Sequence, residues 1–154
     1  MHYIYQAVYS GKISGNGLFT KKCQSFFENT YGFRKALLTT SCTDALEMCA
    51  ILADIQPGDE VIVPTMTFPA TAEIVCYFGA KPVIVDVEKD TLNISLKEIE
   101  KSITPKTKAI IPVHYGGQPC DMDEILDLAK KYSLKVLEDA AHSLPAIYKG
   151  KKIG

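Results

Sequence analysis

The sequence has little that would connect it with a membrane or with nucleic acid. No run approaches the roughly 20 apolar residues that a membrane-spanning helix needs, and the first residues lack the basic and apolar segments of a secretory signal. The 17 basic residues are scattered along the chain, and the formal net charge is −1. Both kinds of partner require a dense basic surface, so we expect neither a membrane nor a nucleic acid as a partner.

The cysteines also lack the pattern of a structural site. There are five of them, an odd number, and no two are spaced as C-x-x-C. This pattern fits reduced thiols better than a disulfide framework or a zinc site. We therefore expect reduced thiols, no bound metal and a cytoplasmic location.

Two common nucleotide-binding motifs are missing. The only G-x-G triplet is Gly15-Asn16-Gly17, which follows no predicted strand and lacks the third glycine of a dinucleotide-binding loop. No G-x-x-x-x-G-K-[ST] segment is present either. Neither a dinucleotide fold nor a P-loop is therefore indicated.

What the sequence does contain is an alternation of strand-like and helix-like segments. Apolar, β-branched runs occur at residues 60–63, 82–87, 108–113 and 134–137, and a further strand is predicted at residues 36–39. The segments between the later runs have helical spacing, as in residues 44–54, where one apolar face repeats at i, i+3, i+4 and i+7. The pattern predicts one α/β domain over residues 1–154, with a mostly parallel sheet between two helical layers. The glycine-rich start, up to Phe19, is predicted to be a surface loop.

The first candidate site lies where the strand at 36–39 runs into a helix. Small and hydroxyl residues at a helix start leave backbone N–H groups free to bind an anion such as a phosphate. Ser41, Cys42, Thr43 and Asp44 occupy this position. The alternative is an ordinary helix cap formed by Thr43 or Asp44.

Two further candidates follow predicted strands, at the sheet edge where α/β proteins bind ligands. Phe68 could stack on a planar ligand, or it could simply be a packed aromatic residue. Asp139 could pair with a ligand cation and His142 could donate a hydrogen bond, or both could belong to a solvated helix cap. His114, after a third strand, could line the site or be a satisfied core histidine.

Together these segments resemble the DegT/DnrJ/EryC1/StrS aminotransferases, over nearly the whole chain and in the family's order. The matching segments are Thr40–Glu47, Gln56–Val61, Pro64–Phe68, Pro112–Gly117 and Glu138–His142. The resemblance implies the large domain of the type I fold of pyridoxal 5′-phosphate (PLP) enzymes. It also implies transamination of a nucleotide-linked keto-sugar, with glutamate as the expected amino donor, in cell-surface or secondary-metabolite sugar synthesis.

The resemblance also assigns roles to residues. Ser41, Cys42, Thr43 and Asp44 would surround the cofactor phosphate, and Cys42 stands where many relatives have glycine or alanine. Phe68 would stack on the pyridine ring, Asp139 would pair with the ring nitrogen, and His142 would lie near the phenolic oxygen. Gly15, Asn16, Gly17 and His114 would contact the substrate. Segments at residues 10–12 and 102–108 are typical of members that act on dTDP-4-keto-6-deoxyhexoses.

Family members are much longer than this chain. The resemblance therefore implies a truncated large domain, without the small carboxyl-terminal domain and without the lysine that forms the Schiff base. The lysines at 149, 151 and 152 do not fit that role. A homodimer is expected for the full-length protein. Two alternatives stay open: a related keto-sugar dehydratase, with histidine in place of that lysine, and a non-catalytic remnant or binding module.

Overall fold

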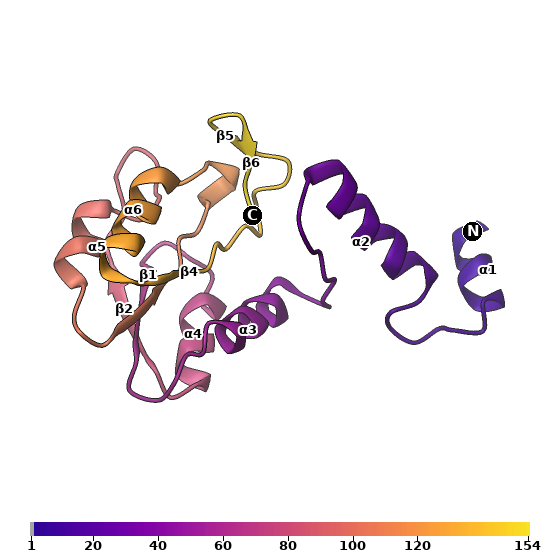
Figure 1. Cartoon of the computed structure of the whole chain (residues 1–154), viewed down its shortest axis with the longest axis horizontal. Coiled ribbons are helices and arrows are strands. Elements are labelled where there is room, and N and C mark those ends of the chain that lie inside the picture. Colours follow the sequence, from indigo (N-terminus) through magenta and orange to yellow (C-terminus); the bar gives the residue numbers. More distant parts are fainter. Residues whose placement is uncertain (1) are drawn as a thin grey trace. The chain divides into compact units, whose positions relative to one another are not determined.

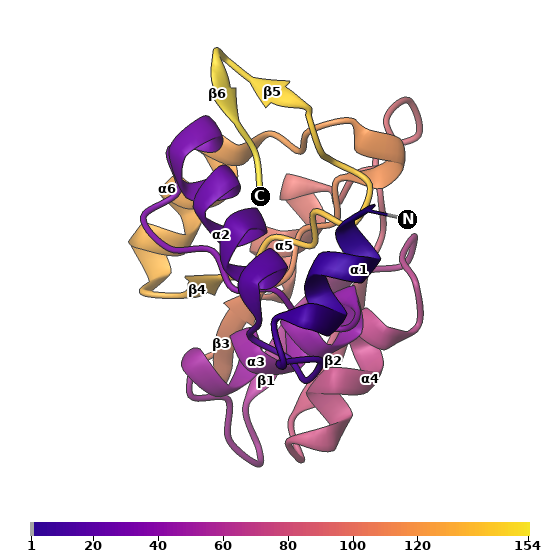
Figure 2. The same cartoon turned by 90° about the vertical axis from the view of Figure 1, so that its right-hand side faces the viewer.

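A computed structural model describes residues 2–154, which divide into two units, one up to Thr40 and one from Ser41 to Gly154. Figures 1 and 2 show the elements along the chain. No helix in the described residues is long and apolar enough to span a membrane. The elements, in chain order, are α1 (His2–Tyr9), α2 (Leu18–Tyr31), α3 (Cys42–Leu52), β1 (Glu60–Pro64), α4 (Ala70–Tyr77), β2 (Lys81–Val85), α5 (Leu96–Ser102), β3 (Thr107–Ile110), the short 3₁₀ helix η1 (Tyr115–Gly117), α6 (Met122–Tyr132), β4 (Lys135–Val136), β5 (Ile147–Tyr148) and β6 (Lys151–Lys152).

The first unit contains α1 and α2, and α1 corrects a prediction. The sequence predicted a loop up to Phe19, yet the first residues are helical. Tyr5 and Tyr9 lie one helical turn apart and their rings stack with centroids 4.2 Å apart, a type of i,i+4 pair that stabilises a helix. The prediction gave more weight to the glycines that follow this helix than to its aromatic spacing. Within residues 2–19, the irregular part is the stretch between α1 and α2.

The predicted strand at residues 36–39 does not form. A strand requires a neighbouring backbone to bond with, and no strand among residues 2–154 pairs with this segment. Instead, the N–H of Ala36 donates to the Glu28 carboxylate at 3.1 Å. The apolar composition of Ala36, Leu37 and Leu38 was therefore not sufficient to make a strand here.

The second unit contains the predicted parallel sheet. Its strand order is β2-β1-β3-β4, and all three pairings are parallel, with Ile62 of β1 opposite Val83 of β2 and Ile110 of β3. Because consecutive strand residues point to opposite faces, Val61 and Val63 lie in one core cluster and Ile62 in the other. A separate antiparallel pair, β5 and β6, comes at the end of the chain.

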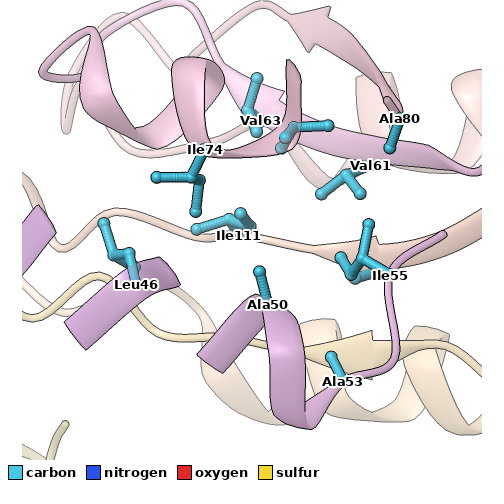
Figure 3. Close-up of a cluster of buried hydrophobic side chains, with 11 residues drawn as sticks. Leu46, Ala50, Ala53, Ile55, Val61, Val63, Ile74, Ala80 and Ile111 are labelled. Carbon is cyan, nitrogen blue, oxygen red and sulfur yellow. The ribbon is translucent and has the colours of Figure 1, made fainter. Parts of the chain in front are cut away.

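Helices cover both faces of this sheet, as predicted. The first core cluster joins α3 and α4 to one face through residues such as Leu46, Ala50 and Ile74, drawn in Figure 3. The second cluster joins α5 and α6 to the other face through Ile99 and Ile125. The result is a three-layer α/β/α arrangement, visible in Figure 1.

The carboxyl ends of the central strands bring distant segments together. β1 leads into the turn that contains Phe68 and then into α4. The chain beyond β4 continues beside the chain beyond β3, because the N–H of Asp139 donates to the Pro112 carbonyl at 2.9 Å and the N–H of His114 donates to the Asp139 carbonyl at 3.1 Å. These two bonds fix the backbone of Asp139 at the edge where α/β proteins bind ligands.

Candidate functional site

A cavity of about 420 Å³ opens at this edge, within the second unit. Five residues singled out in the sequence line it: Cys42, Thr43, Phe68, Asp139 and His142. They come from the start of α3, from the turn after β1 and from the segment after β4, so the fold gathers residues almost 100 positions apart. The volume falls in the range of small-molecule sites.

Asp139 supplies a buried negative charge to this cavity. The residue is 5% exposed, and its carboxylate accepts hydrogen bonds from Thr71 Oγ1 at 3.0 Å, from the N–H of Ala141 at 3.2 Å and from Cys42 Sγ at 3.7 Å. All three donors are neutral. The ion pairs formed within residues 2–154 do not include Asp139.

A buried carboxylate is costly unless hydrogen bonds or a cation compensate its charge, and here hydrogen bonds from neutral groups do so in part. A carboxylate has about four lone-pair positions, and three are taken by the donors just described. One position is therefore left for a further donor, and Asp139 lines the cavity. A ligand with a protonated ring nitrogen would supply both the missing hydrogen bond and the missing positive charge.

The start of α3 lies on the cavity wall, at the position predicted to bind an anion. Ser41 is the cap, because its Oγ accepts from the N–H of Asp44 at 3.1 Å. The prediction that an ordinary cap would be formed by Thr43 or Asp44 is therefore wrong, since the helix begins earlier, at Cys42. This leaves Cys42 and Thr43 in the first turn, where backbone N–H groups and the helix dipole favour a phosphate.

The thiol of Cys42 lies between the anion site and the carboxylate. Burial raises the pKa of this thiol, and the negative charge of Asp139 and the hydrogen bond to it raise it further. The thiol is therefore neutral at physiological pH and acts as a weak hydrogen-bond donor. A negative charge here would repel both Asp139 and a phosphate, so the neutral form suits the site.

Three rings surround the cavity: Phe68, Tyr115 and His142. Phe68 is 72% exposed and so is not a packed core aromatic within the described residues. The rings of Tyr115 and His142 meet edge to face, with centroids 6.5 Å apart. Gly117 has a φ of +85° and lies so near the backbone of His142 that a Cβ on it would be 2.8 Å from the His142 carbonyl oxygen. This close approach fixes the segment that carries His142.

His114 is fully buried next to the site. Its Nδ1 accepts from the N–H of Cys120 at 3.1 Å, so the ring proton is on Nε2, which donates to the Glu138 carboxylate at 2.9 Å. The ring therefore joins three segments of the core. It also lines a small cavity of about 60 Å³ beside the main one, and its assignment as a substrate contact stays a prediction.

The other residues named from the sequence do not line the main cavity. Ser41 and Asp44 form the helix cap behind its wall. Gly15, Asn16 and Gly17 lie between α1 and α2 in the first unit, where Gly17 precedes α2 and Asn16 has a positive φ of 60°. Their role toward a substrate stays a prediction.

Sequence reasoning missed Thr67, Thr71 and Tyr115, all of which line the cavity. Thr71 lies in a helix of small and apolar residues, where a threonine carries no recognisable motif. A structure is needed to see that it faces Asp139. No lysine of residues 2–154 lines the cavity, and no cluster in this range could hold a metal ion.

Comparison with known proteins identifies the family. The sequence profile of the DegT/DnrJ/EryC1/StrS aminotransferase family matches residues 1–154. The chain belongs to this family. It is 43% identical over 152 residues to GDP-perosamine synthase of Caulobacter vibrioides, covering 99% of this chain and 41% of that protein.

Solved structures agree with the assignment. The aminotransferase from Psychrobacter cryohalolentis superposes with a TM-score of 0.92 at 37% identity, over 98% of this chain and 38% of that one. A putative sugar aminotransferase from Streptococcus pneumoniae in its PLP form superposes with a TM-score of 0.87 at 33% identity, over 98% of this chain and 43% of that one. The fold is therefore that of PLP-dependent sugar aminotransferases, and the chain spans about two fifths of the length of these proteins.

The residues of the cavity fit PLP. The cofactor carries a phosphate, a flat ring and a basic ring nitrogen. The first turn of α3 suits the phosphate, the exposed ring of Phe68 suits a flat partner, and the remaining lone pair of Asp139 suits a protonated nitrogen. All three features line one cavity.

Proposed function

We propose that this chain forms the cofactor site of a PLP-dependent aminotransferase that acts on a nucleotide-linked keto-deoxysugar, with glutamate as the amino donor. The observation that carries the proposal is the buried carboxylate of Asp139, which lines the cavity, has three neutral donors and has room for one more. Few ligands other than a pyridinium meet that demand together with an anion site and an exposed aromatic ring in the same cavity.

Each residue has a defined task in this proposal. Asp139 holds the proton on the ring nitrogen, which keeps the ring cationic. When bound, PLP supplies an electron-withdrawing ring that stabilises a substrate carbanion. Thr43 and the N–H groups around it bind the phosphate, Phe68 packs on the ring, and His142 donates to the phenolic oxygen.

The proposal needs a lysine amine to bind the cofactor carbonyl and to move a proton between substrate and cofactor. Since none of the lysines in residues 2–154 lines the cavity, that amine comes from other residues of the full-length protein or of a second subunit. We propose that the protein acts as a homodimer in the cytoplasm.

For the substrate we propose a dTDP-linked 4-keto-6-deoxyhexose. Support for a nucleotide-linked sugar comes from the likeness to GDP-perosamine synthase, which also makes a GDP-linked sugar the direct competitor. The segments at residues 10–12 and 102–108 favour the dTDP form.

The test uses the protein expressed from its own gene, loaded with pyridoxamine phosphate. Adding a dTDP-4-keto-6-deoxyhexose should convert the bound cofactor to PLP, which is followed by absorbance, and should give an aminated sugar by mass spectrometry. The GDP-linked sugar serves as the comparison for base preference. A sugar that loses a hydroxyl without gaining nitrogen would indicate the dehydratase, and no reaction with either sugar would contradict the proposal.

A further inference from the structure

Two threonines form a hydroxyl chain behind Asp139. Thr71 is 1% exposed and lies in the first turn of α4, and its Oγ1 is 3.0 Å from Oδ2 of Asp139. Thr67, in the turn before α4, has its Oγ1 2.7 Å from the Oγ1 of Thr71. The three residues therefore make a continuous line of hydrogen bonds from the turn after β1 to the segment after β4.

The carboxylate at the end of this hydroxyl chain determines which group donates each proton. An ionised carboxylate can only accept, so Thr71 must donate its single hydroxyl proton to Asp139. The proton between the two threonines must then come from Thr67, whose Oγ1 is 2.7 Å from Thr71 Oγ1 and also 3.3 Å from the Phe68 carbonyl oxygen, a longer alternative. Each donation polarises the next, so the bond that reaches the carboxylate is stronger than that of an isolated threonine.

The two oxygens of the carboxylate are held differently. Oδ1 accepts from the N–H of Ala141 and lies near the thiol of Cys42. Within residues 2–154, Oδ2 has Thr71 as its hydrogen-bond donor. Loss of the Thr71 hydroxyl therefore leaves Oδ2 without a partner and leaves the plane of the carboxylate fixed from one side only.

We propose that Thr71, supported by Thr67, is a positioning residue that holds the Asp139 carboxylate directed at the ring nitrogen of the cofactor. This inference rests on the proposed function and assigns it two residues that do not touch the reacting atoms. The hydroxyl chain gives Oδ2 of this buried side chain a hydrogen-bond partner, without which the buried oxygen would be costly before the cofactor arrives.

The test separates action through the ring nitrogen from general damage to the cavity. Dissociation constants are measured for PLP and for its 1-deaza analogue, in which a C–H group replaces the ring nitrogen. The proteins are the native form, Thr71→Val, Thr71→Ser and Thr67→Val, each expressed from the natural gene and checked by circular dichroism. The quantity compared is the preference for PLP, the ratio of the two dissociation constants.

The Thr71→Val change should lower the preference for PLP by about tenfold, which corresponds to the loss of one hydrogen bond to a charged group. Thr71→Ser keeps the hydroxyl and should restore most of the preference. Thr67→Val should lower it by a smaller factor, and it provides the reading if Thr71→Val does not fold.

An equal loss of affinity for both ligands would show a packing role and would overturn the inference. So would a Thr67→Val protein with unchanged preference alongside an unfolded Thr71→Val protein. A native protein that binds both ligands equally, or binds neither, would instead show that the proposed function itself is wrong.

Discussion

The contact between Gly117 and the backbone of His142 leads to a prediction that can be worked out from the structure. Gly116 and Gly117 are adjacent and both have positive φ, +59° and +85°. A Cβ on Gly116 would meet nothing within 4 Å, whereas one on Gly117 would be 2.8 Å from the His142 carbonyl oxygen. Gly116→Ala is therefore a matched control that carries the backbone strain but not the steric overlap.

The expected losses follow from these two contributions. Alanine at positive φ costs about 1–2 kcal/mol, and the reduced freedom of the unfolded chain offsets about 0.4–1 kcal/mol of it in both variants. Gly116→Ala should thus lower the free energy of unfolding by about 1.6 kcal/mol or less. Gly117→Ala adds overpacking of about 1–3 kcal/mol, because the opposing atom is backbone and cannot rotate away.

The assay is urea unfolding of both variants and of the native protein, with the slope checked for constancy. Gly117→Ala should be less stable than Gly116→Ala by at least about 1 kcal/mol. It should also bind PLP more weakly, since relief of the overlap moves the segment that carries His142. Equal stability of the two variants would refute the close approach.

Three further predictions concern the core, the acid stability and the thiol. Ile62→Ala should lower the free energy of unfolding, measured in urea, by about 2–5 kcal/mol, because Ile62 is fully buried. Ile84, on the neighbouring strand β2, is 60% exposed, so Ile84→Ala should lower it far less. The hydrogen bond from the Thr104 hydroxyl lowers the pKa of Glu60, and the hydrogen bond and charge of Lys81 lower it further. The stability from Glu60 is present above its unfolded pKa of about 4.3 and is lost as pH falls through the lower folded pKa. Thr104→Val should therefore reduce the loss of stability seen when unfolding is measured at decreasing pH. Burial raises the pKa of Cys42, so its alkylation, followed by mass spectrometry, should accelerate only at alkaline pH and should slow when PLP is bound; rapid alkylation at neutral pH would contradict the first part.

Much of the fold could be predicted because the strands of the second unit form hydrogen bonds with one another. The run at residues 60–63 became β1, ending one residue later at Pro64, and the run at 134–137 contains β4. The equally strand-like run at 36–39 did not become a strand, since no described backbone pairs with it. Local composition predicts a strand only where a neighbour is available.

The candidate site was predictable where chemistry follows a strand and was missed elsewhere. Asp139 and Phe68 follow strands, so their position at the sheet edge could be inferred. Thr71 lies one residue inside a helix, and nothing in its surroundings reveals that its hydroxyl meets a carboxylate 68 positions away. The predicted cap, Thr43 or Asp44, lies too late along the chain, and the observed cap is Ser41. Several adjacent residues in this segment are of types that can cap a helix, so the sequence does not distinguish them.

The most direct test of the central claim is the affinity of the native protein and of Asp139→Asn for PLP, measured by titration at neutral pH. Asparagine keeps the shape of the side chain and removes its charge, so the account predicts PLP binding by the native protein and an affinity at least about tenfold lower in the variant. An Asp139→Asn protein that folds and binds PLP as tightly as the native one would contradict the account, because the buried carboxylate would then have no part in holding the cofactor.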